Sequence, residues 1–160
     1  MQAVQGRGKV FTLHPQLRLI DDSYNANVAS VMAAIDTLAS LPGQSIVVLG
    51  DMLELGENSA QYHADVGQYA ARKGIEKLYC IGDYAVNTAL GFDNQGSVEQ
   101  AQRFTDMDTL NKALVNELHA LSEQPCTVLV KGSRGAKMER VVTALMQSSL
   151  HQLTEEQPSC

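Results

Sequence analysis

The chain has 160 residues and a formal net charge of −6, with 12 Lys and Arg against 18 Asp and Glu. This length suits one domain built around a single core and is too short for two comfortable domains. An acidic balance of this kind, with a pI near 5.1, offers no electrostatic footprint for a nucleic acid, so a general DNA-binding or RNA-binding role is disfavoured.

Composition also bears on compartment and on metal content. No apolar run approaches the ~20 residues of a membrane-spanning helix, and the polar N-terminus lacks the apolar core of a signal peptide. Cys80, Cys126 and Cys160 are odd in number and lack C-x-x-C spacing, which favours buried thiols over disulfides. The four histidines are too scattered to indicate a zinc site. We therefore expect a soluble, cytoplasmic protein.

The first third of the chain predicts a hairpin followed by a strand, a turn and a helix. Short strands are expected at residues 9–13 and 17–20. The stretch LIDDSYNAN at residues 19–27 then leads into a helix over residues 28–41, because apolar residues recur there at i, i+4 and i+7. Asn27 is a candidate N-cap for this helix.

The rest of the chain alternates apolar runs of strand length with helical patterns. Strands are expected at residues 45–49, 77–81, 101–105 and 127–130. Helices are expected after Ser59 as a cap, near Tyr84, from Asp108 and after Gly135, with a loop at residues 91–96. This alternation predicts an α/β fold: a Rossmann-like, mostly parallel sheet with helices on both faces.

We expect residues 1–150 to form a single α/β domain. The polar segment at residues 151–160 is expected to be a frayed tail.

Three of the predicted strands end in unusual loops: DDSYNAN at residues 21–27, GDMLELG at residues 50–56 and KGSRG at residues 131–135. In a parallel sheet these loops emerge at the same edge, where ligands bind. A helix cap needs only one polar residue, whereas the first loop offers five polar or aromatic side chains, Asp21, Asp22, Tyr24, Asn25 and Asn27. The crowding favours a functional site over a simple cap.

The KGSRG loop combines backbone N–H groups, two cations and a following helix, which is a reasonable site for an anion. The alternative is a glycine-rich turn whose Lys and Arg are solvated. The chain contains no Walker A loop, and no G-x-S-x-G, G-x-G-x-x-G or H-E-x-x-H motif. Any phosphate cradle must therefore come from elsewhere.

Together, LIDDSYNAN ahead of a helix, VLGDMLELG and LVKGSRGAKME resemble the C-terminal domain of the Mur ligases, which build the bacterial cell wall. Within that family the motifs are similar to those of the ligases that add D-alanyl-D-alanine to UDP-N-acetylmuramoyl-tripeptide. The resemblance covers about residues 5–147. One departure is Val28, where the family usually has Pro; Pro would only pre-set φ at the first helical turn.

The resemblance implies a division of labour. A central domain outside this chain would carry the P-loop, Mg²⁺, most of the ATP contacts and the acyl-phosphate chemistry, and the C-terminal domain would close over it. Arg7 and Asp22 match nucleotide-binding positions. Asn25 lies in the same turn, where the nucleotide and the dipeptide would meet; we assign it to the nucleotide site, with the dipeptide as the alternative. Positions expected to line the pocket for D-alanyl-D-alanine are Asp51, Lys131, Ser133 and Arg134. No catalytic residue and no metal ligand is assigned to this chain.

Two other functions remain open from the residues. Paired acids after one strand, an acid after another and a terminal Lys also suit the metal-assisted site of a phospho-acceptor receiver domain in signalling. Against a receiver, Asp51 follows the very next strand, the Lys131 loop is KGSRG rather than Lys-Pro, and 160 residues exceed what a receiver requires. The third hypothesis is a catalytically silent nucleotide-binding domain.

Overall fold

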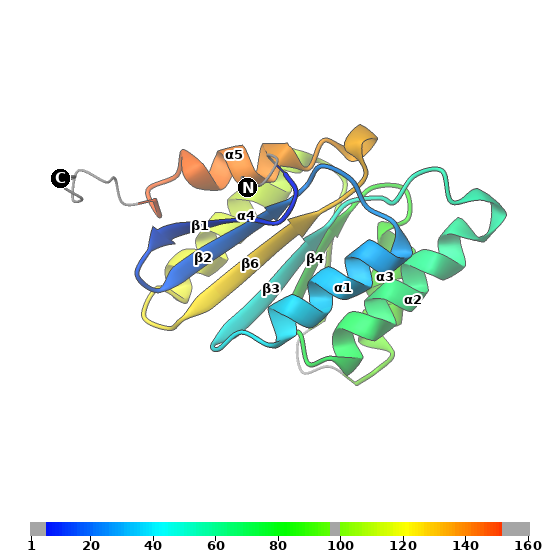
Figure 1. Cartoon of the computed structure of the whole chain (residues 1–160), viewed down its shortest axis with the longest axis horizontal. Coiled ribbons are helices and arrows are strands. Elements are labelled where there is room, and N and C mark those ends of the chain that lie inside the picture. The colour runs from blue at the N-terminus through cyan, green and yellow to red at the C-terminus, as the bar shows by residue number, and fades with distance from the viewer. Residues whose placement is uncertain (1–5, 97–99, 152–160) are drawn as a thin grey trace.

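Six strands form one sheet in the computed structural model, which describes residues 6–96 and 100–151 (Figure 1). Across the sheet the order is β1 (Lys9–His14), β2 (Leu17–Asp22), β6 (Cys126–Lys131), β3 (Gln44–Leu49), β4 (Lys77–Ile81) and β5 (Gln102–Phe104). The β1–β2 pair is antiparallel, and the other four pairs are parallel. The predicted hairpin and mostly parallel sheet are confirmed.

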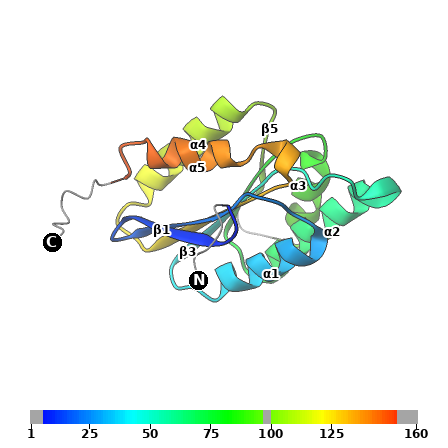
Figure 2. The ribbon, with the colours of Figure 1, turned by 45° about the horizontal axis from the view of Figure 1, so that its top comes forward.

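Helices cover both faces of the sheet (Figure 2). Five are α-helices, α1 (Val28–Ala39), α2 (Ser59–Arg72), α3 (Ala85–Asp93), α4 (Met107–Ala120) and α5 (Glu139–Met146), and two are short 3₁₀ turns, η1 (Gly56–Asn58) and η2 (Arg134–Ala136). One face carries α4 and α5 and the other carries α1, α2 and α3. The predicted α/β class with two helical layers is therefore confirmed.

The strands divide the core into two apolar clusters because successive side chains point to opposite faces of a sheet. In β6, Val128 and Val130 pack into the cluster under α4 and α5, whereas Leu129 packs into the cluster under α1, α2 and α3. All six residues of β6 are buried. A continuous apolar run is what a central parallel strand requires.

The strand order places a topological switch point at the end of β6. From β2 the chain crosses through α1 to β3 and leaves an intervening position that β6 fills later, after α4 has crossed on the opposite face. The loops after β2 and β3 consequently lead to one face, and the loop after β6 leads to the other. Ligands bind where neighbouring strands diverge in this way.

The third helix is longer than the sequence predicts, because Gly91 belongs to α3 and not to a loop. A Cβ at Gly91 would lie 2.0 Å from the carbonyl oxygen of Ala64 in α2, and one at Gly67 would lie 2.0 Å from that of Thr88 in α3. The two glycines let the backbones of α2 and α3 approach closely. This tertiary contact decides the role of Gly91.

Two helix starts also differ from the prediction. Ser59 is the first residue of α2 rather than its cap, and its hydroxyl donates to the carbonyl of Gly56 at 2.9 Å. The end of the KGSRG segment forms η2, and α5 begins only at Glu139. By contrast, Asn27 caps α1 as predicted, in a reciprocal capping box with Ser30.

The ends of the chain lie largely outside the described residues. Residues 1–5 and 152–160, together with 97–99, are not described, so the predicted tail at residues 151–160 is represented by His151 alone. The backbone N–H of His151 donates to the carbonyl of Ser148 at 3.2 Å. No helix in the described part of the chain is both long and apolar enough to cross a membrane.

Cys80 and Cys126 are buried free thiols, as the sequence predicts, while Cys160 lies outside the described residues. Desolvation by burial raises the pKa of each of the two thiols to about 12. Because the thiolate is the nucleophile, both side chains should be inert in the folded protein.

We predict that iodoacetamide at pH 8 alkylates neither Cys80 nor Cys126 in the native protein and alkylates both in urea. Raising the pH to 9 should not change this, since both pKa values lie well above it. Peptide mass mapping distinguishes each thiol from Cys160, and alkylation in urea is the positive control. Rapid native alkylation of Cys80 or Cys126 would contradict the burial.

Candidate functional site at the strand ends

An ion pair whose ammonium is buried joins the ends of β2 and β6. The Lys131 ammonium donates to Asp22 Oδ2 at 2.8 Å and to the carbonyl oxygen of Asn25 at 3.2 Å. The Lys131 side chain is 2% exposed, whereas that of Asp22 is 23% exposed. A buried ammonium needs such partners, because an unpaired one would carry a large desolvation cost. Lys131 therefore fixes the direction of the Asp22 carboxylate and the path of the following turn.

The two adjacent acids have different tasks. Oδ1 of Asp21 accepts from both the backbone N–H and the hydroxyl of Ser23, at 3.2 and 2.5 Å, so this buried carboxylate closes the turn after β2. Oδ1 of Asp22 has no hydrogen-bond partner within residues 6–96 and 100–151. Asp21 is 2% exposed, whereas the Asp22 side chain is 23% exposed, so of these two acids it is Asp22 that can present a carboxylate oxygen to a ligand.

Ser133 ties the three loops together. Its hydroxyl accepts from the N–H of Leu53 at 2.7 Å and donates to the carbonyl of Ala26 at 3.3 Å. Its backbone N–H donates to the carbonyl of Asp51 at 3.0 Å. Because the hydroxyl has only one proton, and that proton is used in the bond to Ala26, Ser133 has no side-chain donor left for a ligand.

Asp51 supports the neighbouring loop. Its Oδ2 and Oδ1 accept from the backbone N–H groups of Asp83 and Tyr84, at 2.8 and 3.0 Å, where the chain leaves β4. Gly82 adopts a φ of +121°, and a Cβ there would lie 2.4 Å from the same carboxylate. Asp51 is therefore anchored to the protein backbone, and its predicted role toward a substrate amine stays a prediction.

His63 braces the GDMLELG loop from α2. Its Nε2 accepts from the Met52 N–H at 2.9 Å, and its Nδ1 lies 2.7 Å from the carbonyl of Ser59, to which it donates. These roles assign the neutral imidazole, so the 4.0 Å separation from Asp51 Oδ1 is not an ion pair. The ring also stacks on Tyr84, with centroids 4.6 Å apart. Sequence reasoning did not identify this brace, because the hydrogen bond to Met52 spans eleven residues.

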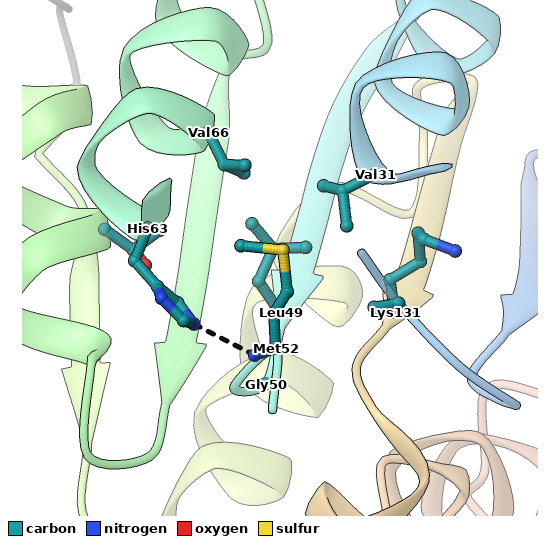
Figure 3. Close-up of a pocket in the computed structure, with 9 residues that line it drawn as sticks. Val31, Leu49, Gly50, Met52, His63, Val66 and Lys131 are labelled. Atoms are coloured by element: carbon teal, nitrogen blue, oxygen red, sulfur yellow. Dashed lines mark hydrogen bonds between the residues drawn. The ribbon is translucent and has the colours of Figure 1, made fainter. Parts of the chain in front are cut away.

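A small cavity lies behind these loops, between α1, α2 and the ends of β3 and β6 (Figure 3). Its volume is about 10 Å³, room for about one water. In Figure 3 the Lys131 side chain turns away from Met52 and His63. The cavity is too small for a substrate.

A larger cleft of about 550 Å³ opens beside the KGSRG loop. Its walls come from the loops after β3, β4 and β5 and from the start of α5, and include Asp51, Leu53, Gly135 and Arg140. Leu53 is 41% exposed at its rim. The volume falls within the range of small-molecule sites.

Two arginines distant in sequence gather around one tyrosine. The guanidinium carbon of Arg7 lies 3.9 Å from the centroid of the Tyr24 ring, and that of Arg134 lies 4.8 Å from it. Arg134 also donates to the Tyr24 hydroxyl at 3.2 Å. Both arginines are exposed. The sequence placed each of them in a candidate site but did not show that Tyr24 connects them.

The predicted residues thus converge at one edge of the sheet, in two settings. Arg7, Asp22, Asn25, Lys131 and Arg134 surround the turn at Tyr24, whereas the carboxylate of Asp51 lies beside the β4 loop. Lys131 and Ser133 are buried and hold the loops. Asn25 is exposed, and its Oδ1 accepts from the Ala26 N–H at 2.9 Å.

The geometry does not provide the acid cluster of a receiver domain. Asp21 is bound to Ser23, Asp22 to Lys131 and Asp51 to the β4 loop. Within the described ranges, no group of three or more His, Cys, Asp or Glu side chains could hold a metal ion.

Comparison with known proteins places residues 6–134 in a family described as "Mur ligase, glutamate ligase domain". The UDP-N-acetylmuramoyl-tripeptide–D-alanyl-D-alanine ligase of Escherichia coli (strain K12) is 40% identical over 152 residues, which cover 92% of this chain and 31% of that protein. A crystal structure of MurF from Acinetobacter baumannii superposes with a TM-score of 0.84 at 30% identity, covering 92% of this chain and 32% of that one.

The MurF ligase of Thermotoga maritima, solved in complex with ADP, superposes with a TM-score of 0.72 at 25% identity. The match covers 91% of this chain and 31% of that one. The chain thus spans slightly less than a third of the length of these relatives.

We predict that Lys131→Met lowers the free energy of unfolding by roughly 1–3 kcal/mol, because Asp22 and the Asn25 carbonyl lose a charged donor. Asp22 can regain water, which keeps the loss below that for a fully buried charge. Urea unfolding of Lys131→Met, Asp22→Ala and the double variant should give a double-mutant coupling of about 0.5–3 kcal/mol. Strictly additive costs would show that the pair does not hold the loops.

Proposed function

Because this chain belongs to the Mur ligase family, as its glutamate ligase domain, we propose that it is the C-terminal part of an ATP-dependent ligase. The proposed ligase joins D-alanyl-D-alanine to UDP-N-acetylmuramoyl-tripeptide during peptidoglycan synthesis in the cytoplasm. The family description names glutamate, but the relative that is 40% identical is named for the dipeptide. The dipeptide is therefore the acceptor we propose.

The observation that carries this proposal is the meeting of two groups of residues at one strand-end edge. The free oxygen of Asp22 and the guanidinium of Arg7 form the proposed nucleotide side, and the guanidinium of Arg134 forms the proposed dipeptide side. An amide-bond ligase needs its activated acid and its amine in one place, since orienting both reactants removes much of the barrier.

The residues on the nucleotide side fit ADP or ATP in their chemistry. A carboxylate oxygen can accept from a ribose hydroxyl, and a planar guanidinium can pair with phosphate oxygens. Asp22 offers the first and Arg7 the second, and Asn25 is exposed in the same turn. The relative from Thermotoga maritima that was solved with ADP supports nucleotide use. The phosphate cradle would come from the central domain.

Magnesium does not fit this chain in the same way. The carboxylates of Asp21, Asp22 and Asp51 are engaged by Ser23, Lys131 and backbone N–H groups, and the described residues contain no group of three or more potential ligands. We therefore place the Mg²⁺ of the proposed reaction in the central domain, and we assign no step in this chain to it.

On the dipeptide side, a zwitterion presents an amine and a carboxylate. Arg134, exposed at the tip of the loop after β6, can pair with the carboxylate. The cleft beside this loop, with Asp51 in its wall and Leu53 at its rim, has room for a dipeptide. Lys131 and Ser133 would act by holding the loop, since their polar atoms already have protein partners.

We predict that the 160-residue chain alone has no ligase activity. It supplies one wall of the site, and charge stabilisation of phosphoryl and acyl transfer needs the phosphates, the metal and both substrates together. Phosphate release and dipeptide ligation should appear only when the N-terminal and central domains are added. ATP-dependent ligation by the chain alone would contradict the proposal.

A further prediction concerns the substitution Arg134→Ala. In the full-length ligase, Arg134→Ala should weaken use of D-alanyl-D-alanine by about 10- to 150-fold, since a charge-assisted hydrogen bond contributes roughly 1.5–3 kcal/mol. The KM for ATP should change much less. Steady-state kinetics with each substrate varied in turn provides the measurement.

Asp22→Asn is the matched variant, with the opposite expectation. It should raise the KM for ATP more than the KM for the dipeptide, while the amide oxygen still accepts from Lys131. If Arg134→Ala weakens ATP and dipeptide equally, the KGSRG loop binds phosphate. If it changes neither, Arg134 is a solvated side chain and the dipeptide assignment fails.

A further inference from the structure

We propose that Tyr24 is a positioning residue that sets the places of both Arg7 and Arg134, so that the nucleotide side and the dipeptide side depend on one side chain. The inference rests on the proposed function. It adds Tyr24, a residue that belongs neither to the proposed nucleotide side nor to the proposed dipeptide side. It follows from the contacts of the Tyr24 backbone, ring and hydroxyl.

The Tyr24 backbone holds the segment that carries Arg7. The Tyr24 N–H donates to the carbonyl of Gly6 at 2.7 Å, and the N–H of Gly8 donates to the carbonyl of Asp21 at 2.9 Å. Gly6 and Gly8 both have a φ of +78°, a backbone conformation that residues other than glycine adopt only at an energetic cost. The Gly-Arg-Gly segment is thereby fixed on both sides of Arg7 against the turn after β2.

The Tyr24 ring then directs the Arg7 side chain. An exposed arginine samples many rotamers, but its guanidinium lies 3.9 Å from the ring centroid, close enough for a cation–π contact. Within residues 6–96 and 100–151 the Arg7 guanidinium makes no hydrogen bond or ion pair beside this ring contact. The aromatic ring is therefore the feature that orders this side chain.

The Tyr24 hydroxyl directs the second arginine. Arg134 donates to it at 3.2 Å, and its guanidinium carbon lies 4.8 Å from the ring centroid. Arg134 is the first residue of η2, and its side chain is exposed. The hydroxyl thus fixes Arg134 by a directional hydrogen bond, whereas Arg7 depends on the ring alone.

Packing does not account for Tyr24. The ring is half-buried and belongs to neither apolar cluster of the core. A Leu at this position would leave both clusters intact, and a Phe would remove only the hydroxyl. The two substitutions therefore separate the ring from the hydroxyl.

The experiment compares Tyr24→Phe and Tyr24→Leu in the full-length ligase, with ATP and D-alanyl-D-alanine varied separately. Tyr24→Phe should raise the KM for the dipeptide about two- to tenfold, the loss expected for one hydrogen bond, and leave the KM for ATP unchanged. Tyr24→Leu should raise the dipeptide KM at least as much and also raise the KM for ATP about two- to fivefold, the loss expected for an exposed cation–π contact.

Phe11→Leu is the matched control. It removes a cation–aromatic pair of the β1–β2 hairpin, in which the Lys9 ammonium lies 5.1 Å from the Phe11 ring centroid. It should change neither KM, and thermal melts should show all three variants folded. A purely structural effect of losing an aromatic ring near β1 would move the control as well.

The proposal is overturned if Tyr24→Leu leaves both KM values unchanged, or if Tyr24→Phe affects both substrates as Tyr24→Leu does. Failure of the proposed function looks different. In that case, the unmodified ligase does not use the dipeptide, or Arg7→Ala and Arg134→Ala are themselves without effect on either substrate.

Discussion

The pairing of Lys131 with Asp22 holds the strand-end face in its observed form. Lys131 ends the central strand β6. Its buried ammonium is stable there only while Asp22 and the Asn25 carbonyl accept its hydrogen bonds. The same contacts fix the turn after β2 on which Tyr24 stands. The contacts that satisfy the buried Lys131 charge thus also orient the exposed carboxylate oxygen of Asp22. Through the turn, they also orient the guanidinium groups of Arg7 and Arg134.

Support in this site is layered from the inside outward. Lys131, Ser133 and His63 are buried and use their polar atoms on neighbouring loops, whereas Arg7, Asn25 and Arg134 are exposed. The residues that the loop motifs assign to binding therefore fall into two groups: those that hold the loops and those that can reach a ligand. Burial makes that division, because a side chain with committed hydrogen bonds has little left for a substrate.

The sequence predicted the parts that depend on periodicity and local chemistry. Alternating strand and helix patterns gave the sheet and brought residues 21–27, 50–56 and 131–135 to one edge, and Asn27 could be recognised as a cap from its position. It missed features that depend on distant contacts. Asp51 accepts from N–H groups 32 and 33 residues away, and Gly91 is helical because it faces Ala64. No local pattern contains such partners.

The two borders of the sheet limit what other chains can do with it. β5 has only three residues, and β1, on the opposite border, carries the exposed Lys9 and a register irregularity between Thr12 and His14. Short, charged or irregular borders are poor templates for strand addition and hence for aggregation. Within the described residues, neither border therefore offers a neighbouring copy a long, regular strand to extend, even though the interior strands are rich in β-branched residues.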